Sequence, residues 1–375
     1  MRDVAAVANV STKTVSNVLR GWPPVRTDTR ERVQAALDQV GYRLNHAPKV
    51  LRTGRSGALA VAVPWLENPY FAELTSEIVR RAEDRGFTVI VDQTGGQRDR
   101  ELAVVKGLRR HSIDGIIFSP WGLDHRDFDQ ASDVPMVLLG ERVGAGVMDH
   151  VAIDNITAAR AIVTHLIELG HRRIAVLGQQ SIAPGEVTWE RVRGYALALK
   201  DAGRQVDPML QADANTFDRS AGARSMRRLL DLEHQPDAVF CVSDLLAVGA
   251  IHMIHEAGLR VPQDIAVAGF DNIKEGEFAN PPLTTVGPEK GEVAEAALEL
   301  LVSRLDDSAQ PPRHISPRYE VVVRASSVAE DATRRVRPSH ARTPVDEAAL
   351  QLMIAPRGTP ARHSGQSEER ADRDG

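Results

Sequence analysis

Several polar side chains near the start of the chain could bind a nucleic acid. They are Ser11, Thr12, Lys13, Thr14, Ser16, Asn17 and Arg20. Helical spacing places most of them on one face, opposite the apolar side chains of Val15, Val18 and Leu19. Hydroxyl, amide and ammonium groups of this kind hydrogen-bond the edges of bases and the phosphates of DNA. A polar face can also be only the solvated side of a helix, so the neighbouring elements must decide between the two interpretations.

The residues before this stretch predict a partner helix and a tight turn. Val4, Ala5 and Ala8 give residues 3–8 a small apolar face at helical spacing. Asn9 lies where the chain must reverse, and Asn tolerates a left-handed backbone better than most residues. Ser11 has the hydroxyl and the position of an N-cap for the second helix. Two short helices across a tight turn are typical of a helix-turn-helix, which places its second helix in the major groove of DNA.

A third helix is predicted from Thr27 to Val40, with Gly41 as its stop. The three helices would form one small all-α head. Up to Arg55 the chain has ten Lys and Arg against four Asp and Glu, a net charge of +6, whereas the whole chain has a net charge of −5. A basic head on an acidic body favours a nucleic-acid partner at the head, because each neutralised phosphate releases counterions.

The body of the chain alternates short apolar runs with amphipathic helical stretches, which predicts an α/β fold. Strands separated by helices in this order form doubly wound parallel sheets. Roughly 270 residues exceed one ordinary core, so two α/β lobes are expected. The predicted strands are Ala58–Val63, Thr88–Val91, Gly115–Phe118, Met136–Leu139, Val151–Ile153, Ile174–Leu177, Ala238–Val242, Ile265–Gly269 and Tyr319–Val323.

The C-terminal segment, residues 328–375, is predicted to be disordered, since it is rich in Arg, Pro, Ser and acidic residues. Residues 348–354 are apolar but too few for the sustained heptads of a tetramerising coiled coil. The predicted domains are therefore a head (1–44), a linker (45–56), a two-lobed body (57–327) and a tail (328–375).

No enzyme motif is present in the sequence. It has no P-loop, dinucleotide fingerprint, His-Glu-x-x-His or Gly-x-Ser-x-Gly pattern. The single cysteine, Cys241, lies in an apolar run and is expected in the core, in a chain of the reducing cytoplasm. His165 and His171 flank a predicted helix end and are expected to satisfy it rather than to bind a metal. No apolar run approaches the roughly 20 residues of a membrane span, and no cofactor is expected.

The sequence resembles the lactose-repressor (LacI/GalR) family of bacterial transcription regulators. Residues 3–5, 10–19, 29–33, 45–54, 68–74, 114–117, 165–174, 269–271 and 282–285 carry the resemblance. It implies that Asn45 to Arg52 form a hinge helix in the minor groove, with Asn45 at its start and Leu51 as an apolar wedge between base steps. Leu44 and Pro48 depart from the family's usual Pro and Ala. The resemblance further implies two lobes like those of periplasmic sugar-binding proteins, three chain crossings and an effector in the cleft between the lobes.

Candidate effector-binding residues follow the predicted strands, where α/β sheets bind their ligands. They are Tyr70, Phe71, Arg191, Phe217, Ser243, Asp244 and Asp271. The resemblance implies that Arg191 and Asp271 bind effector hydroxyls and that Phe217 is an aromatic platform. Asp271 could instead cap a helix, and Phe217 could be core.

Three tryptophans, Trp65, Trp121 and Trp189, also follow predicted strands, where they could stack on a sugar ring or pack the lobes. The prediction is a repressor that binds a palindromic DNA operator as a homodimer, controlled by a small polyhydroxylated effector, with a sugar favoured. A purine or nucleoside corepressor is the alternative that Tyr70 and Phe71 keep open. An exported sugar-binding transport protein is the less favoured alternative, since the chain starts with DNA-reading residues rather than a signal peptide.

Overall fold

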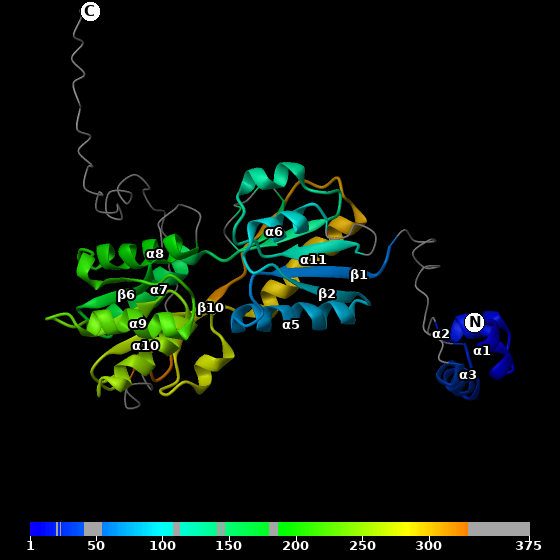
Figure 1. Cartoon of the computed structure of the whole chain (residues 1–375), viewed down its shortest axis with the longest axis horizontal. Helices are drawn as coiled ribbons and strands as arrows, with labels where there is room; N and C mark the ends of the chain where they lie inside the picture. The colour runs from blue at the N-terminus through cyan, green and yellow to red at the C-terminus, as the bar shows by residue number, and fades with distance from the viewer. Residues whose placement is uncertain are drawn as a thin grey trace, which may run out of the picture. The chain divides into compact units, whose positions relative to one another are not determined.

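The computed structural model describes residues 1–19, 22, 24–40, 55–107, 113–140, 143, 146, 148–179 and 187–328 (Figure 1). These residues form two compact units, which are called the head and the body. The head unit runs to Ala58 and includes Ile113 and Asp114, and the body unit starts at Leu59. Arg20, Asn45, Leu51 and all but the first residue of the predicted tail lie outside the described residues, so the expectations for them stay predictions.

The head contains the three predicted helices. They are α1 (Arg2–Val7), α2 (Thr12–Leu19) and α3 (Thr27–Val40), and α3 has the predicted bounds. Val4, Val15 and Val33, one from each helix, are fully buried against one another in the head's small core. Asn9 has a left-handed backbone with φ of 52°, as the predicted chain reversal requires.

The first lobe of the body is built on one six-stranded sheet. Its strands are β1 (Ala58–Val63), β2 (Thr88–Gln93), β3 (Gly115–Phe118), β4 (Met136–Leu139), β5 (Asp149–Val151) and β11 (His314–Ile315), in the order β11-β5-β4-β3-β1-β2. Helices α5 (Pro69–Asp84) and α11 (Lys290–Asp306) share a core with alternate residues of β1, β3 and β4. Successive side chains of a strand point to opposite faces of the sheet, so the remaining residues of these strands face the other side. That side is covered by α6 (Arg98–Val105) and the 3-10 helix η1 (His125–Gln130).

The second lobe repeats this plan with a second six-stranded sheet. Its strands are β6 (Ile174–Gln179), β7 (Gln211–Asp213), β8 (Ala238–Cys241), β9 (Ala266–Phe270), β10 (Thr284–Pro288) and β12 (Tyr319–Val322), in the order β12-β10-β9-β8-β6-β7. The sheet lies between α7 (Asn155–Glu168) with α8 (Val187–Asp201) and α9 (Arg219–Leu230) with α10 (Asp244–Glu256), as Figure 1 shows. Two 3-10 helices, η2 (Pro208–Leu210) and η3 (Lys274–Phe278), complete the lobe.

The chain passes between the two lobes three times, as the resemblance implied. It leaves the first lobe after β5, returns from β10 into α11, and leaves again between β11 and β12. Each crossing follows the end of a strand, so all three gather where strand ends of both lobes meet. The predicted α/β class with two parallel-dominated sheets is confirmed, and the exception among the recorded pairings is the antiparallel pair of β10 and β12.

Several details of the strand prediction are wrong. Strands β2 and β6 each extend two residues beyond their predicted ends. The predicted strand Val151–Ile153 is placed two residues too late. Ala152 and Ile153 are apolar because they line a pocket, not because they belong to the strand. The strand predicted at Ile265–Gly269 lies one residue later. Strands β7, β10 and β11 were not predicted, since β7 and β11 are very short and β10 ends in Gly287 and Pro288.

Candidate functional site

The polar stretch of the head forms the start and outer face of α2. Ser11 is the N-cap: its Oγ accepts a hydrogen bond from the backbone N–H of Thr14 at 3.0 Å. The Thr14 hydroxyl lies 2.8 Å from the same Oγ and so takes part in the cap. Thr12 and Lys13 are exposed, Ser16 and Asn17 are half-buried, and Val15 and Val18 point into the core. The structure therefore brings these predicted DNA-binding residues to one side of a capped helix.

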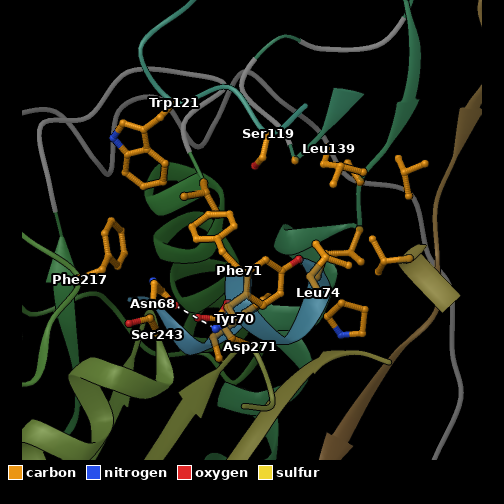
Figure 2. A pocket seen from close by; sticks show the side chains of 18 of the residues that line it. Asn68, Tyr70, Phe71, Leu74, Ser119, Trp121, Leu139, Phe217, Ser243 and Asp271 are labelled. Carbon is orange, nitrogen blue, oxygen red and sulfur yellow. Dashed lines mark hydrogen bonds between the residues drawn. The ribbon is translucent and has the colours of Figure 1, made fainter. Parts of the chain in front are cut away.

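A pocket in the body lies between the strand ends of the two lobes (Figure 2). Its lining includes six of the seven predicted effector residues, namely Tyr70, Phe71, Arg191, Phe217, Ser243 and Asp271, and also Trp65 and Trp121. These residues come from segments that lie up to about 200 positions apart in the sequence, and the strand-end rule of α/β sheets brings them together.

An ion pair forms the polar part of the pocket. Arg191 Nη1 donates to Asp271 Oδ1 at 3.0 Å and to the carbonyl of Val242 at 2.7 Å, and its Nε donates to Asn155 Oδ1 at 2.9 Å. The guanidinium also lies 3.6 Å from the ring centroid of Phe270. The side chains of Arg191 and Asp271 are 11% and 13% exposed, so protein groups surround most of both. The exposed part can still present polar atoms to a ligand.

Aromatic rings form the other walls of the pocket. Trp65 and Trp121 pack edge to face with centroids 4.8 Å apart, and Trp121 meets Phe217 of the second lobe at 5.7 Å. Tyr70 and Phe71 form a similar pair at 5.4 Å. In Figure 2 the rings of Trp121 and Phe217 lie at one end of the view and Leu74 and Leu139 at the other. The pocket thus combines flat apolar surfaces with one polar corner.

One predicted contact is corrected. Asp244 does not line the pocket, because its carboxylate is fully buried and accepts hydrogen bonds from Thr285 Oγ1 at 2.6 Å and from the Ile273 N–H at 2.9 Å. Burial, reinforced by the nearby Asp271 charge, raises the pKa of Asp244 to about 8. Trp189 is not among the lining residues either; its ring lies 5.0 Å from the guanidinium of Arg193.

Hydrogen bonds from neighbouring side chains stabilise the turn that carries Asp271. Asp271 and Asn272 both have positive φ, 114° and 50°, a conformation that is unfavourable for residues other than glycine. Lys290 Nζ donates to the carbonyls of both residues, at 3.0 and 2.5 Å. Together with the Asp244 bond to Ile273, these contacts keep the Asp271 carboxylate directed at Arg191.

Sequence reasoning missed some polar residues of the pocket. Asn68, Ser119 and Thr188 line it, and Asn155 holds Arg191 from behind. A signal existed for Asn68, because an Asn before Pro69 is typical of a helix start, and its side chain does cap α5 by accepting from the Tyr70 N–H at 3.0 Å. Cys241 is a core residue as predicted, and burial raises the pKa of its thiol. His165, which was expected to satisfy a helix end, is instead buried with its Nε2 3.0 Å from Ser327 Oγ.

Comparison with known proteins identifies the family. Residues 1–45 match the family described as bacterial regulatory proteins, lacI family, and residues 163–327 match a periplasmic binding protein-like domain. Over 307 residues the chain is 35% identical to the HTH-type transcriptional repressor CytR of Escherichia coli strain K12, covering 81% of this chain and 89% of that one. The chain belongs to the LacI family of bacterial regulatory proteins.

Solved structures of LacI-type regulators have the same fold. The complex of the transcriptional regulator CelR with cellobiose is 31% identical, with a TM-score of 0.63 over 86% of this chain and 98% of that one. The lac repressor dimer bound to operator and the anti-inducer ONPF is 26% identical, with a TM-score of 0.71 over 87% of this chain and 98% of that one.

Membership of the LacI family confirms the predicted class of function: the chain is a DNA-binding transcriptional regulator that responds to a small molecule, and not an enzyme. It also sets aside the transport-protein alternative, because the match to the regulators includes the head. Within the described residues, no helix has the length and apolar character to cross a membrane.

Proposed function

We propose that the pocket binds a small, uncharged, polyhydroxylated molecule, with a carbohydrate as the favoured class. The Arg191–Asp271 pair carries this proposal. These two are the charged residues among the described residues that line the pocket, and their charges compensate each other. A charged ligand would lose hydration without a free counter-charge, whereas hydroxyl groups can bind both a guanidinium and a carboxylate.

The aromatic walls support the same ligand class. The C–H faces of a sugar ring pack on flat aromatic surfaces, and Trp65, Trp121 and Phe217 supply such surfaces beside the polar corner. CelR, whose structure was solved with cellobiose, is one of the similar proteins. A nucleoside is the second candidate, because the Tyr70–Phe71 pair could hold a flat base while the ion pair binds ribose hydroxyls.

We further propose that ligand binding in the body changes the affinity of the head for DNA. The functional unit is a homodimer on a palindromic operator, with Ser11, Thr12, Lys13, Thr14, Ser16, Asn17 and Arg20 at the major groove and Asn45 and Leu51 at the minor groove. Repression is the proposed outcome and the cytoplasm the proposed location, since the operator lies there. The lac repressor dimer, solved on its operator with an anti-inducer, supports this coupling.

Calorimetry on the full-length protein tests the ligand class. Monosaccharides, disaccharides, purines and nucleosides are titrated separately, and a sugar is expected to bind. Arg191→Lys should weaken that binding about tenfold or more, because an ammonium cannot replace the three hydrogen bonds of the guanidinium. Arg126→Lys, at an exposed residue outside the pocket lining, is the matched control and should bind like the original protein. Tight purine binding without any sugar binding would overturn the proposal.

Footprinting tests the regulation. The protein is bound to the DNA beside its own gene, with and without the sugar that binds in calorimetry. A protected palindrome whose protection changes with the sugar is expected. Protection that is identical at every sugar concentration would contradict control by the pocket, because a ligand shifts DNA affinity only if its own affinity differs between the two states.

A further inference from the structure

A fully buried carboxylate behind the pocket has no role in contacting a ligand. Glu101 lies on α6, is 0% exposed and does not line the pocket. Its Oε1 accepts from the backbone N–H of Trp121 at 2.9 Å, and its Oε2 accepts from that of Gly122 at 2.8 Å. Burying an acidic side chain is costly, and the two charge-assisted bonds to N–H groups offset that cost.

These bonds connect the loops that follow three neighbouring strands. Trp121 and Gly122 follow β3, and Thr94, whose Oγ1 lies 3.4 Å from Glu101 Oε1, follows β2. The Thr94 N–H donates to the carbonyl of Val63 at the end of β1 at 2.9 Å. Glu101 thus lies at the centre of a network that fixes how these strand ends enter the pocket.

The wall formed by Trp65 and Trp121 rests on the same loops. Gly96, two residues after Thr94, lies so close beneath both indoles that a Cβ there would come within 3.1 Å of each ring. Its N–H donates to Thr94 Oγ1 at 3.3 Å. The backbone at Trp121 is therefore held by Glu101, and both indoles pack closely over Gly96.

We propose that Glu101 is the positioning residue of the ligand pocket: by accepting the N–H groups of Trp121 and Gly122, it sets the indole wall against which the ligand packs. The proposal rests on the proposed function of the pocket. An acceptor on both oxygens suits this place, because the groups that meet them at Trp121 and Gly122 are N–H donors. A glutamine would turn one of the two acceptors into a donor facing another donor.

Two matched pairs of variants test the proposal in the full-length protein. Glu101→Gln is compared with Glu83→Gln, an exposed glutamate on α5. Gly96→Ala is compared with Gly95→Ala: the two glycines have similar φ, 63° and 66°, so the backbone strain of alanine is shared. Alanine at 95 would meet only the Gln97 side chain, at an ordinary 3.7 Å, whereas alanine at 96 would push both indoles.

Two readouts are measured on each variant. The first is the exciton-coupled circular dichroism of the Trp65–Trp121 pair, which requires the two rings to keep their 4.8 Å separation and needs no ligand. The second is the Kd for the sugar that binds the original protein in calorimetry. Glu101→Gln and Gly96→Ala should lose the exciton signal and bind the sugar about tenfold more weakly. Both control variants should retain the signal and the affinity.

The outcomes separate this proposal from the proposed function. An unchanged exciton signal and Kd in Glu101→Gln would overturn the role of Glu101. If Glu101→Gln does not fold, Glu101→Asp replaces it, because the shorter side chain keeps the charge but cannot reach both N–H groups from the same place. An unchanged exciton signal and Kd in Glu101→Asp would then overturn the proposal. If Arg191→Lys binds the sugar normally, the proposed ligand site is wrong, while the exciton signal still decides whether Glu101 positions the indoles.

Discussion

The polar corner of the pocket depends on two side chains that need each other. Arg191 is held by Asn155, Val242 and Phe270, so its position does not depend on a ligand. Its charge is compensated by Asp271 at 3.0 Å. Removing one member of a nearly buried ion pair leaves the other charge uncompensated, and this costs more than the pair itself contributes.

Asp271→Asn should therefore reduce both stability and ligand binding. Asparagine keeps the shape of the side chain but not its charge, so Arg191 becomes an uncompensated cation. The free energy of unfolding is expected to fall by about 3 kcal/mol, at the low end for buried pairs because both groups retain some exposure. Urea unfolding and calorimetry measure the two effects. Asp231→Asn, at an exposed residue after α9, should change neither.

Asn17 should determine the base preference of α2. Its amide can bind adenine through two hydrogen bonds, so Asn17→Ala is expected to cost about 1–3 kcal/mol at particular base pairs of the operator. Fluorescence anisotropy with a set of singly substituted operators measures this. Gln39→Ala, at an exposed position of α3, is the control. An equal loss on every sequence would assign Asn17 to the DNA backbone instead, and the same reasoning applies to Lys13→Ala.

The sequence predicted the residues that line the pocket more successfully than the residues that support those side chains from behind. Asp271 closely follows a predicted strand, and the resemblance to the family points to Arg191, Phe217 and Asp271. Glu101 and Lys290 gave no such signal, because their partners lie in other segments and a buried charge cannot be distinguished from a surface charge in a helical pattern. Asp244 was assigned to the ligand although it supports a turn, since adjacency to Ser243 does not show which way a side chain points.

At the scale of elements, two helices of the second lobe approach each other through glycines. Gly222 on α9 faces the backbone of Leu246 on α10, and Gly249 on α10 faces the backbone of Arg219 on α9. A Cβ at Gly249 would lie 2.8 Å from the carbonyl carbon of Arg219 and closer still to its oxygen. Backbone atoms cannot move aside as a flexible side chain can, so the two helices require these glycines.

Gly249→Ala is expected to lower the free energy of unfolding by about 3 kcal/mol, because the methyl group must push α9 and α10 apart. This outweighs the gain of up to about 1 kcal/mol that alanine brings to a helix interior. Thermal unfolding followed by circular dichroism measures the effect. Ser220→Ala, at an exposed position of α9, is the control. A stabilised Gly249→Ala protein would show that the helices separate at little cost.

The elements themselves were largely predictable, and the reasons for the misses are physical. Fully buried strands such as β1 and β3 are continuous apolar runs, and α3 has both periodicity and a glycine stop. The two-residue β11 pairs with β5 only because the chain stays in the first lobe after α11. A contact made over more than 160 positions leaves no trace in so short a segment. The antiparallel β12 is likewise decided by tertiary pairing rather than by pattern.

At the scale of the whole molecule, buried titratable groups make stability depend on pH in two opposite ways. Burial lowers the pKa of His150 and His165, which are 3% and 7% exposed. The unfolded chain then takes up protons below pH about 6.5 while the folded chain resists them, so stability falls as pH decreases. The raised pKa of Asp244, about 8, has the opposite sign, because the folded chain retains a proton that the unfolded chain releases above pH about 4.

The Asp244 effect predicts that stability declines as the pH rises above about 6.5. Above that pH the histidines are neutral in both states, and Asp244 should lower the free energy of unfolding by about 1.4 kcal/mol per pH unit up to pH about 8. Below it, the lowered pKa values of His150 and His165 make their contribution to stability fall as the pH decreases, which opposes the Asp244 effect. Urea unfolding between pH 5 and 8 measures the curve.

Asp244→Asn should remove the decline in stability above pH 6.5, and His165→Gln should reduce the decline below it. His255→Gln, at an exposed position, is the control and should leave the curve unchanged. A curve that rises steadily to pH 8 would show that Asp244 is ionised in the folded protein and that its hydrogen bonds from Thr285 and Ile273 outweigh its burial.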